Sequence, residues 1–75
     1  MELSVRYFAV LRERKGCSVE VVDVPDGLTV RGVYRHLFVP ADVPVAFVLN
    51  REVVPEGAHP RAGDELAFLP PVGGG

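Results

Sequence analysis

The 75-residue sequence has little of what several large classes of protein require. Its one cysteine, Cys17, excludes a disulfide framework and a multi-cysteine metal site. Eight Lys and Arg against ten Asp and Glu give a net charge of −2, which argues against a nucleic-acid module because phosphate contacts need excess positive charge. No apolar run approaches a membrane span and no signal peptide is recognisable. We therefore expect a cytoplasmic protein with no nucleic-acid or membrane partner.

What the sequence does contain is typical of one small folded domain. Hydrophobic residues make up 48% and charged residues 24%, which is ordinary for a globular chain and unlike a disordered one. A chain of this length buries roughly 60% of its unfolded surface on folding, which is enough for a hydrophobic core without disulfides or a structural metal ion. Eight glycines and seven prolines are many for so short a chain, and their positions matter below.

The first third of the chain predicts an antiparallel hairpin. Residues 2–8 alternate between apolar and polar, which is typical of a half-buried strand, although Phe8 then falls on the face expected to be wet. Residues 9–16 are expected to lead into a turn in which Gly16 is the permissive residue. The β-branched residues of 19–24 predict the second strand.

The middle of the chain predicts one short helix. Thr29 can cap it, and the apolar residues that follow recur at helical spacing over about ten residues. Those residues are Val30, Val33, Tyr34, Leu37 and Phe38. Gly32 lowers the intrinsic stability of this helix by roughly 1 kcal/mol relative to alanine, so the helix depends on packing against a sheet.

Three more strands are predicted after the helix. The continuous apolar run 45–49 fits a central strand covered on both faces, 53–54 a short strand, and 65–69 the last strand. A single helix cannot cover several parallel crossovers, so we expect an open mixed sheet of four to five strands with one main helix on one face. With the last strand beside the first, this is an α+β fold of the β-grasp, or ubiquitin-like, type over residues 1–69.

No pattern in this domain predicts an active site. His36 and His59 lack metal-ligand spacing, and Cys17 lacks a positioned base. No glycine pattern fits a phosphate cradle. We expect no bound metal and no permanently bound cofactor.

The final residues, 70–75, predict an extended tail. Pro70 and Pro71 hold the chain extended, and Val72, Gly73 and Gly74 lead to Gly75. Glycines fit a tunnel too narrow for a Cβ atom, so such a tail can present the α-carboxylate of Gly75 to another protein's active site. A frayed terminus or an expression remnant is the alternative interpretation.

Two segments resemble the MoaD family, the small subunit of molybdopterin synthase, within the MoaD/ThiS superfamily. Residues 7–13, followed by Gly16, are similar to the family's first-strand motif. Residues 63–75 are similar to its ending: a Gly-Asp-Glu turn, an apolar strand, Pro-Pro-Val, a small residue and Gly-Gly. The turn at Asn50 and the order of elements also agree.

The resemblance implies a sulfur carrier of molybdenum cofactor biosynthesis. A MoeB-type enzyme would use ATP to adenylate Gly75, and sulfur from a cysteine desulfurase or rhodanese-type donor would convert it to a thiocarboxylate. The tail would then enter a MoaE-type large subunit, in a heterotetramer of two small and two large subunits. There the sulfur would attack the pyranopterin precursor, with the catalytic groups on the large subunit.

By position, the resemblance assigns the sulfur to Gly75 and tail insertion to residues 70–74. It places Phe8, Arg12 and Leu69 at the partner interface, although the family often has an aromatic residue at the position of Leu69. An exposed Phe8 suits such an interface, and a second small core between sheet and loop is the alternative.

Other functions remain open. A carrier for thiamin, tRNA thiolation or cysteine synthesis would share the fold and the Gly-Gly end. A protein modifier conjugated through Gly75 to a lysine belongs to a different class, as does an interaction domain with an inert tail. The first hairpin and Pro70-Pro71-Val72 favour the molybdenum branch.

Overall fold

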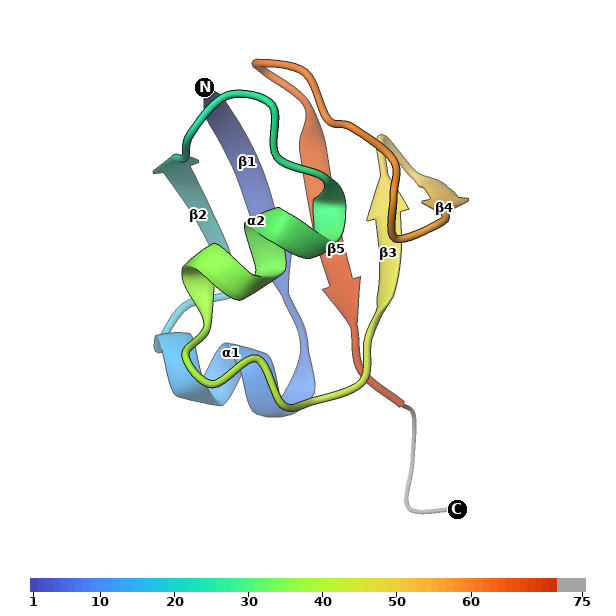
Figure 1. The fold of residues 1–75 in the computed structure, drawn as a ribbon. Helices are drawn as coiled ribbons and strands as arrows, with labels where there is room; N and C mark the ends of the chain where they lie inside the picture. Colours follow the sequence, from blue (N-terminus) through green and yellow to red (C-terminus); the bar gives the residue numbers. More distant parts are fainter. Residues whose placement is uncertain (72–75) are drawn as a thin grey trace.

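Five strands form one mixed sheet in the computed structural model, which describes residues 1–71 (Figure 1). Their order across the sheet is β2–β1–β5–β3–β4. The strands are β1 (Glu2–Tyr7), β2 (Val19–Asp23), β3 (Ala46–Leu49), β4 (Glu52–Val54) and β5 (Glu65–Leu69). The pair β1–β5 is parallel and the other three pairs are antiparallel. The last strand thus lies beside the first in the middle of the sheet, which confirms the predicted β-grasp fold.

Helix α2 (Val30–Leu37) covers one face of this sheet (Figure 1). Thr29 caps it as predicted, because its side-chain oxygen accepts a hydrogen bond from the Gly32 N–H at 3.0 Å. The helix has eight residues, rather than about ten, since Phe38 is already extended (φ −126°, ψ 122°). Its predicted apolar stripe buries Val30, Val33 and Tyr34 against the sheet.

The core is centred on an aromatic cluster between α2 and the sheet. Phe68 of β5 is fully buried, and its ring centroid lies 5.1 to 6.4 Å from four other rings. Those rings belong to Tyr7, Tyr34, Phe38 and Phe47. The two buried tyrosines form hydrogen bonds through their hydroxyl groups. Tyr7 donates to a Glu20 carboxylate oxygen at 2.8 Å, and Tyr34 donates to the Val43 carbonyl at 2.7 Å. Burial, followed by the hydrogen bond to Glu20, raises the pKa of Tyr7.

Sequence reasoning missed a second helix, α1 (Ala9–Lys15), in the segment that leads into the predicted turn at Gly16. Seven residues are too few for an amphipathic repeat to stand out in the sequence, and a single side chain, Leu11, is buried. Gly16 ends the helix at φ 76°, with its N–H bonded to the Arg12 carbonyl at 2.8 Å. The fold therefore has a second short helix, α1, in addition to the predicted helix α2.

Two strand predictions also need correction. Strand β1 ends at Tyr7, since Phe8 is the residue that precedes α1. Strand β3 is not the central strand covered on both faces, because β5 is central and β3 lies next to the edge strand β4. Phe47 of β3 is buried in the core, whereas Ala46 is exposed on the opposite face. An apolar run alone does not reveal that only one face of its strand is covered.

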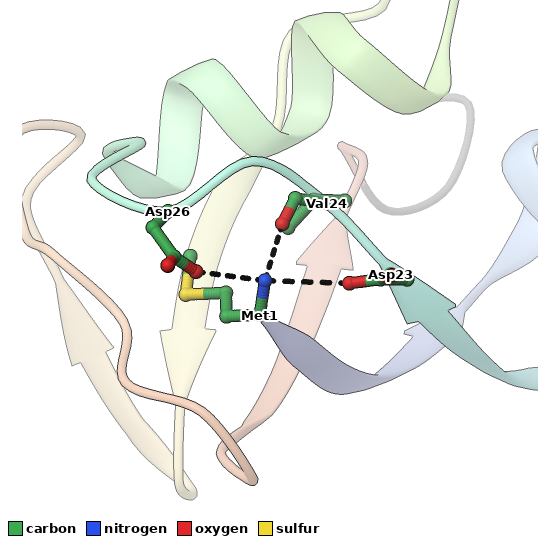
Figure 2. Close-up of polar contacts among 4 residues, drawn as sticks. All are labelled: Met1, Asp23, Val24 and Asp26. Carbon is green, nitrogen blue, oxygen red and sulfur yellow. Dashed lines mark hydrogen bonds and ion pairs between the residues drawn. The ribbon is translucent and has the colours of Figure 1, made fainter.

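The amino group of Met1 links the start of β1 to the segment after β2 through a hydrogen bond and ion pairs (Figure 2). It donates to the Val24 carbonyl and lies 2.8 Å from an Asp26 carboxylate oxygen and 3.3 Å from one of Asp23. The hydrogen bond to Asp26 is the largest cause that raises the pKa of this amine above its ordinary value of 8.0.

This raised pKa predicts a stability that depends on pH. Because the folded-state pKa lies above the unfolded value, the stabilisation is fully present below pH 8.0 and is lost as pH rises through the folded pKa. We expect the free energy of unfolding, measured by urea titration, to fall in this alkaline range. Asp26→Asn is the control and should show a shallower fall; an equal fall in both proteins would contradict the assignment.

Candidate functional site on the open sheet face

The face of the sheet opposite α2 carries a row of side chains that crosses all five strands. The strand registers align Val19 with Arg6, Arg6 with Ala67, Ala67 with Val48, and Val48 with Val53. The outer two, Val19 and Val53, are exposed, while Ala67 in the middle is only 6% exposed. No helix of the described residues covers this face (Figure 1).

A hollow of about 410 Å³ lies over the middle of this row. Ala67 belongs to the central strand, and its small side chain leaves room between longer neighbours. Arg6 and Glu65 form an ion pair here, with 3.4 Å between Nε and Oε1. The hollow is therefore apolar at its centre and charged on one side. Its lining residues are Arg6, Phe8, Val48, Arg51, Glu65, Ala67 and Leu69.

Phe8 and Leu69, two of the three predicted interface residues, both line this hollow and are 39% and 38% exposed. Phe8 is held there by the junction of β1 and α1, where its extended backbone (φ −130°, ψ 151°) precedes the helix. Its carbonyl accepts the Leu11 N–H at 3.1 Å, which fixes the backbone at the edge of the hollow. The third predicted residue, Arg12, is exposed on α1 and does not line the hollow.

Arg51 reaches the hollow from the β3–β4 turn. Asn50 and Arg51 are the two loop residues between the paired Leu49 and Glu52, and both have positive φ, 50° and 70°. This is the backbone of a two-residue primed turn, which favours glycine at the second position. Asn50 also ties the turn to β5, since its side-chain oxygen accepts the Glu65 N–H at 3.0 Å. The positive φ of Arg51 therefore destabilises the turn relative to a glycine at this position.

Replacing Arg51 with glycine tests this backbone strain. We expect Arg51→Gly to raise the free energy of unfolding by about 1 kcal/mol, because glycine adopts positive φ without a Cβ clash. Asn50→Gly is the matched control and should give no gain, since asparagine tolerates this region and its hydrogen bond to Glu65 would be lost. Urea unfolding measures both variants. A destabilised Arg51→Gly protein would show that the side chain stabilises the fold more than its backbone strains it.

The chain leaves the sheet next to the hollow. Leu69, at the end of β5, lines both the hollow and a second apolar depression of about 400 Å³ that runs along Pro70 and Pro71. Pro44, Val45 and Ala46 form the other side of this depression. The predicted tail residues Val72, Gly73, Gly74 and Gly75 lie outside the described residues. An apolar surface thus continues from the sheet face to the point where the tail begins.

Sequence reasoning missed five residues of the hollow: Arg6, Val48, Arg51, Glu65 and Ala67. Arg6 and Ala67 both lie on the sheet face opposite α2. The alternation of side chains along a strand is a signal in the sequence that could have placed them on this face. Their adjacency depends on the parallel pairing of β1 with β5, which no local pattern shows.

Other candidate chemistry is sparse in residues 1–71. Within this range, no group of three or more His, Cys, Asp and Glu side chains is arranged to hold a metal ion. His36 and His59 are exposed, and Cys17 is half-buried with a free thiol. Neither helix of the described chain is long and apolar enough to cross a membrane.

The mixed sheet, the packed helix α2 and the strand that ends in a Pro-Pro exit define a ubiquitin-like β-grasp protein. The model of the ThiS family matches residues 5–75, so the chain belongs to this family of ubiquitin-like sulfur carriers and modifiers.

Solved structures share this fold. SAMP1 from Haloferax volcanii is 31% identical with a TM-score of 0.79, and the match covers 100% of both chains. A putative molybdopterin converting factor subunit 1 from Pyrococcus furiosus shares the fold at 22% identity and a TM-score of 0.81, over 96% of this chain and 99% of that one. A complex of subunits 1 and 2 of the Helicobacter pylori molybdopterin-converting factor contains a chain with 19% identity and a TM-score of 0.59, matched over 100% of both chains.

Proposed function

We propose that this chain is a sulfur carrier of molybdenum cofactor biosynthesis. The observation that carries the proposal is the apolar surface that runs from the hollow on the sheet face to Pro70 and Pro71. A partner that docks on this surface also receives the tail that follows, which brings the carboxylate of Gly75 into the partner's active site. Membership of the ThiS family and the fold shared with molybdopterin converting factor subunits support this role.

The chemistry follows from the reactivity of a carboxylate. A carboxylate is a poor electrophile until one oxygen becomes part of a good leaving group. Attack of the Gly75 carboxylate on the α-phosphorus of ATP would release pyrophosphate and form an acyl-adenylate. The outer sulfur of a donor persulfide would then displace AMP to give an acyl disulfide, and a thiol would cleave it to a thiocarboxylate with release of a disulfide. The thiocarboxylate is a soft nucleophile for transfer to the pyranopterin precursor. In this mechanism the carrier supplies the sulfur atom to be transferred and the surface on which the partner docks.

The partners we propose supply the catalytic groups. A MoeB-type enzyme would bind ATP and adenylate the tail, and a cysteine desulfurase or rhodanese-type protein would provide sulfur. A MoaE-type large subunit would bind the charged carrier, in a heterotetramer of two small and two large subunits. The complex of subunits 1 and 2 from Helicobacter pylori supports such a partner. We place the protein in the cytoplasm, with no permanently bound cofactor.

Intact-mass spectrometry tests this function. The purified chain, incubated with a MoeB-type enzyme, ATP and a sulfur donor, should gain about 16 Da, the difference when sulfur replaces one carboxylate oxygen. A reaction without ATP is the control. An unchanged mass after incubation with active enzyme and ATP would contradict the carrier role.

A protein modifier is the second candidate, and SAMP1 favours it. That protein's structure is also described as small archaeal modifier protein 1, and its 31% identity extends over both full chains. A modifier would join Gly75 to a lysine of another protein and leave branched Gly-Gly remnants after proteolysis. Their presence in cells, and their loss on deletion of this gene, would identify conjugation. Sulfur carriers for thiamin, tRNA thiolation or cysteine synthesis would instead be separated by which product is lost.

Phe8 tests the docking surface directly. Its side chain lines the hollow and is partly exposed, so we expect Phe8→Ala to weaken binding to the MoaE-type subunit by about 2 kcal/mol, roughly 30-fold, and to lower stability by less than about 1 kcal/mol. Val10→Ala is the matched control, because Val10 is also 39% exposed but does not line the hollow. Calorimetry measures both, and equal affinities for Phe8→Ala and the unmodified protein would refute this docking surface.

A further inference from the structure

The chain is very poor in primary amines. Lys15 is its one lysine, and the other seven basic residues are arginines. A guanidinium stays protonated under physiological conditions and offers no nucleophilic lone pair, whereas a neutral amine attacks activated carboxyl groups. The groups of this chain that could attack an acyl-adenylate as amines are therefore the Nζ of Lys15 and the amino group of Met1.

Lys15 does not extend freely into solvent. Its Nζ lies 5.1 Å from the ring centroid of Phe38 and 5.8 Å from that of Tyr7. These two rings pack edge to face, with 5.6 Å between their centroids, and both belong to the core. The electron-rich ring faces attract the ammonium form, and acylation would replace that cation with a neutral amide. The side chain is half-buried at the end of α1, which restricts approach by a large acyl donor.

The Met1 amine is held more tightly. An ammonium has three N–H donors, and three acceptors surround this one: the Val24 carbonyl, Asp23 and Asp26 (Figure 2). The Met1 side chain is only 6% exposed and packs against the core, so the residue cannot swing outward without losing this contact. The raised pKa of the amine acts in the same direction, since it lowers the neutral, nucleophilic fraction.

We propose that this chain is protected from acylation by activated copies of itself, because seven of its eight basic residues are arginines and its two amines are held against aromatic rings and carboxylates. The reaction avoided is attack of an amine nitrogen on the Gly75 carbonyl carbon, which forms an amide bond, expels AMP and releases a proton. The inference rests on the proposed activation of Gly75. One consequence is that the activated Gly75 carboxyl group reacts with a partner and not with another copy of this chain. A second is that, if the protein is a modifier, one copy is attached to each target site and no chain of linked copies forms.

Chemical acylation tests the protection without any activating enzyme. The probe is the N-hydroxysuccinimide ester of acetic acid at neutral pH, applied to the folded Arg35→Lys variant. Arg35 is exposed on α2 and lies outside the hollow, so the variant contains an unprotected lysine as an internal reference. Peptide mass spectrometry over time should show Lys15 acetylated at about one-fifth of the rate of the introduced lysine, the ratio that an ordinary cation–π attraction produces. Lys15 reacting as fast as the introduced lysine would overturn the proposal.

The Met1 amine has its own control. Asp26→Asn removes the carboxylate with the shortest contact, and we expect acetylation of Met1 to be severalfold faster in this variant, because the ion pair is lost and the pKa of the amine falls toward its ordinary value. An unchanged rate would show that the contacts do not protect the amine.

A second arm separates this inference from the proposed function. With a MoeB-type enzyme and ATP, the unmodified chain should form the acyl-adenylate and no chain-to-chain amide. Adducts joined through Lys15 or Met1 would overturn the protection while supporting activation. A failure to form the adenylate would contradict the proposed function, and the acetylation rates would still decide the protection.

Discussion

Removal of Gly75 is expected to abolish sulfur transfer while the domain stays folded. The proposed mechanism places the reacting carboxylate at the end of a tail that must span a fixed distance from the docking surface at Leu69 to the partner's active site. A shorter tail retracts the carboxylate by about 3.5 Å, the length of one extended residue, and reaction geometry is lost over much smaller displacements. An added alanine after Gly75 should fail as well, because it moves the carboxylate forward and adds a Cβ atom.

Three measurements check this result. Intact mass should show no gain of about 16 Da with a MoeB-type enzyme, ATP and a sulfur donor. In cells that lack the small subunit, neither variant should restore cofactor synthesis. Urea unfolding curves of both variants should match those of the unmodified chain, since the strands and the core end before residue 70. Cofactor synthesis restored by the chain without Gly75 would refute the proposed role of the tail.

Phe68→Ala is expected to have the largest effect on stability. Phe68 is fully buried on the central strand, in contact with rings from β1, α2, β3 and the segment after α2. Truncating a buried phenylalanine costs about 3–5 kcal/mol, whereas a domain of this length has a total stability of roughly 4–11 kcal/mol. The variant should therefore lose most of its resistance to urea.

Phe8→Ala is the control for this prediction, because it removes the same side chain from a partly exposed position. Its midpoint of urea unfolding should lie close to that of the unmodified protein. If Phe68→Ala does not fold at all, Phe68→Leu provides an intermediate measurement, since it keeps most of the apolar volume. Equal midpoints for Phe68→Ala and Phe8→Ala would contradict the assignment of Phe68 to the centre of the core.

Predictions from the sequence were most accurate where local chemistry decides the structure. The cap at Thr29 and the last strand, β5, lie where they were predicted, because side-chain hydrogen bonding and apolar spacing are local properties. The helix α1 was missed because it is short and has one buried residue, Leu11, so its formation depends on the tertiary packing of that side chain.

The same contrast applies to the candidate site. The sequence by itself determined the ubiquitin-like fold class, the prediction of a Pro-Pro exit into a glycine tail, and the near-absence of lysine. Only the tertiary structure decided that Phe8 and Leu69 share a hollow with Ala67 while Arg12 lies apart, and that Lys15 rests on two rings. The physical reason is that the hollow forms across the parallel pairing of the first and last strands. That pairing joins residues some sixty positions apart and is stabilised by the core as a whole, so no local segment encodes it.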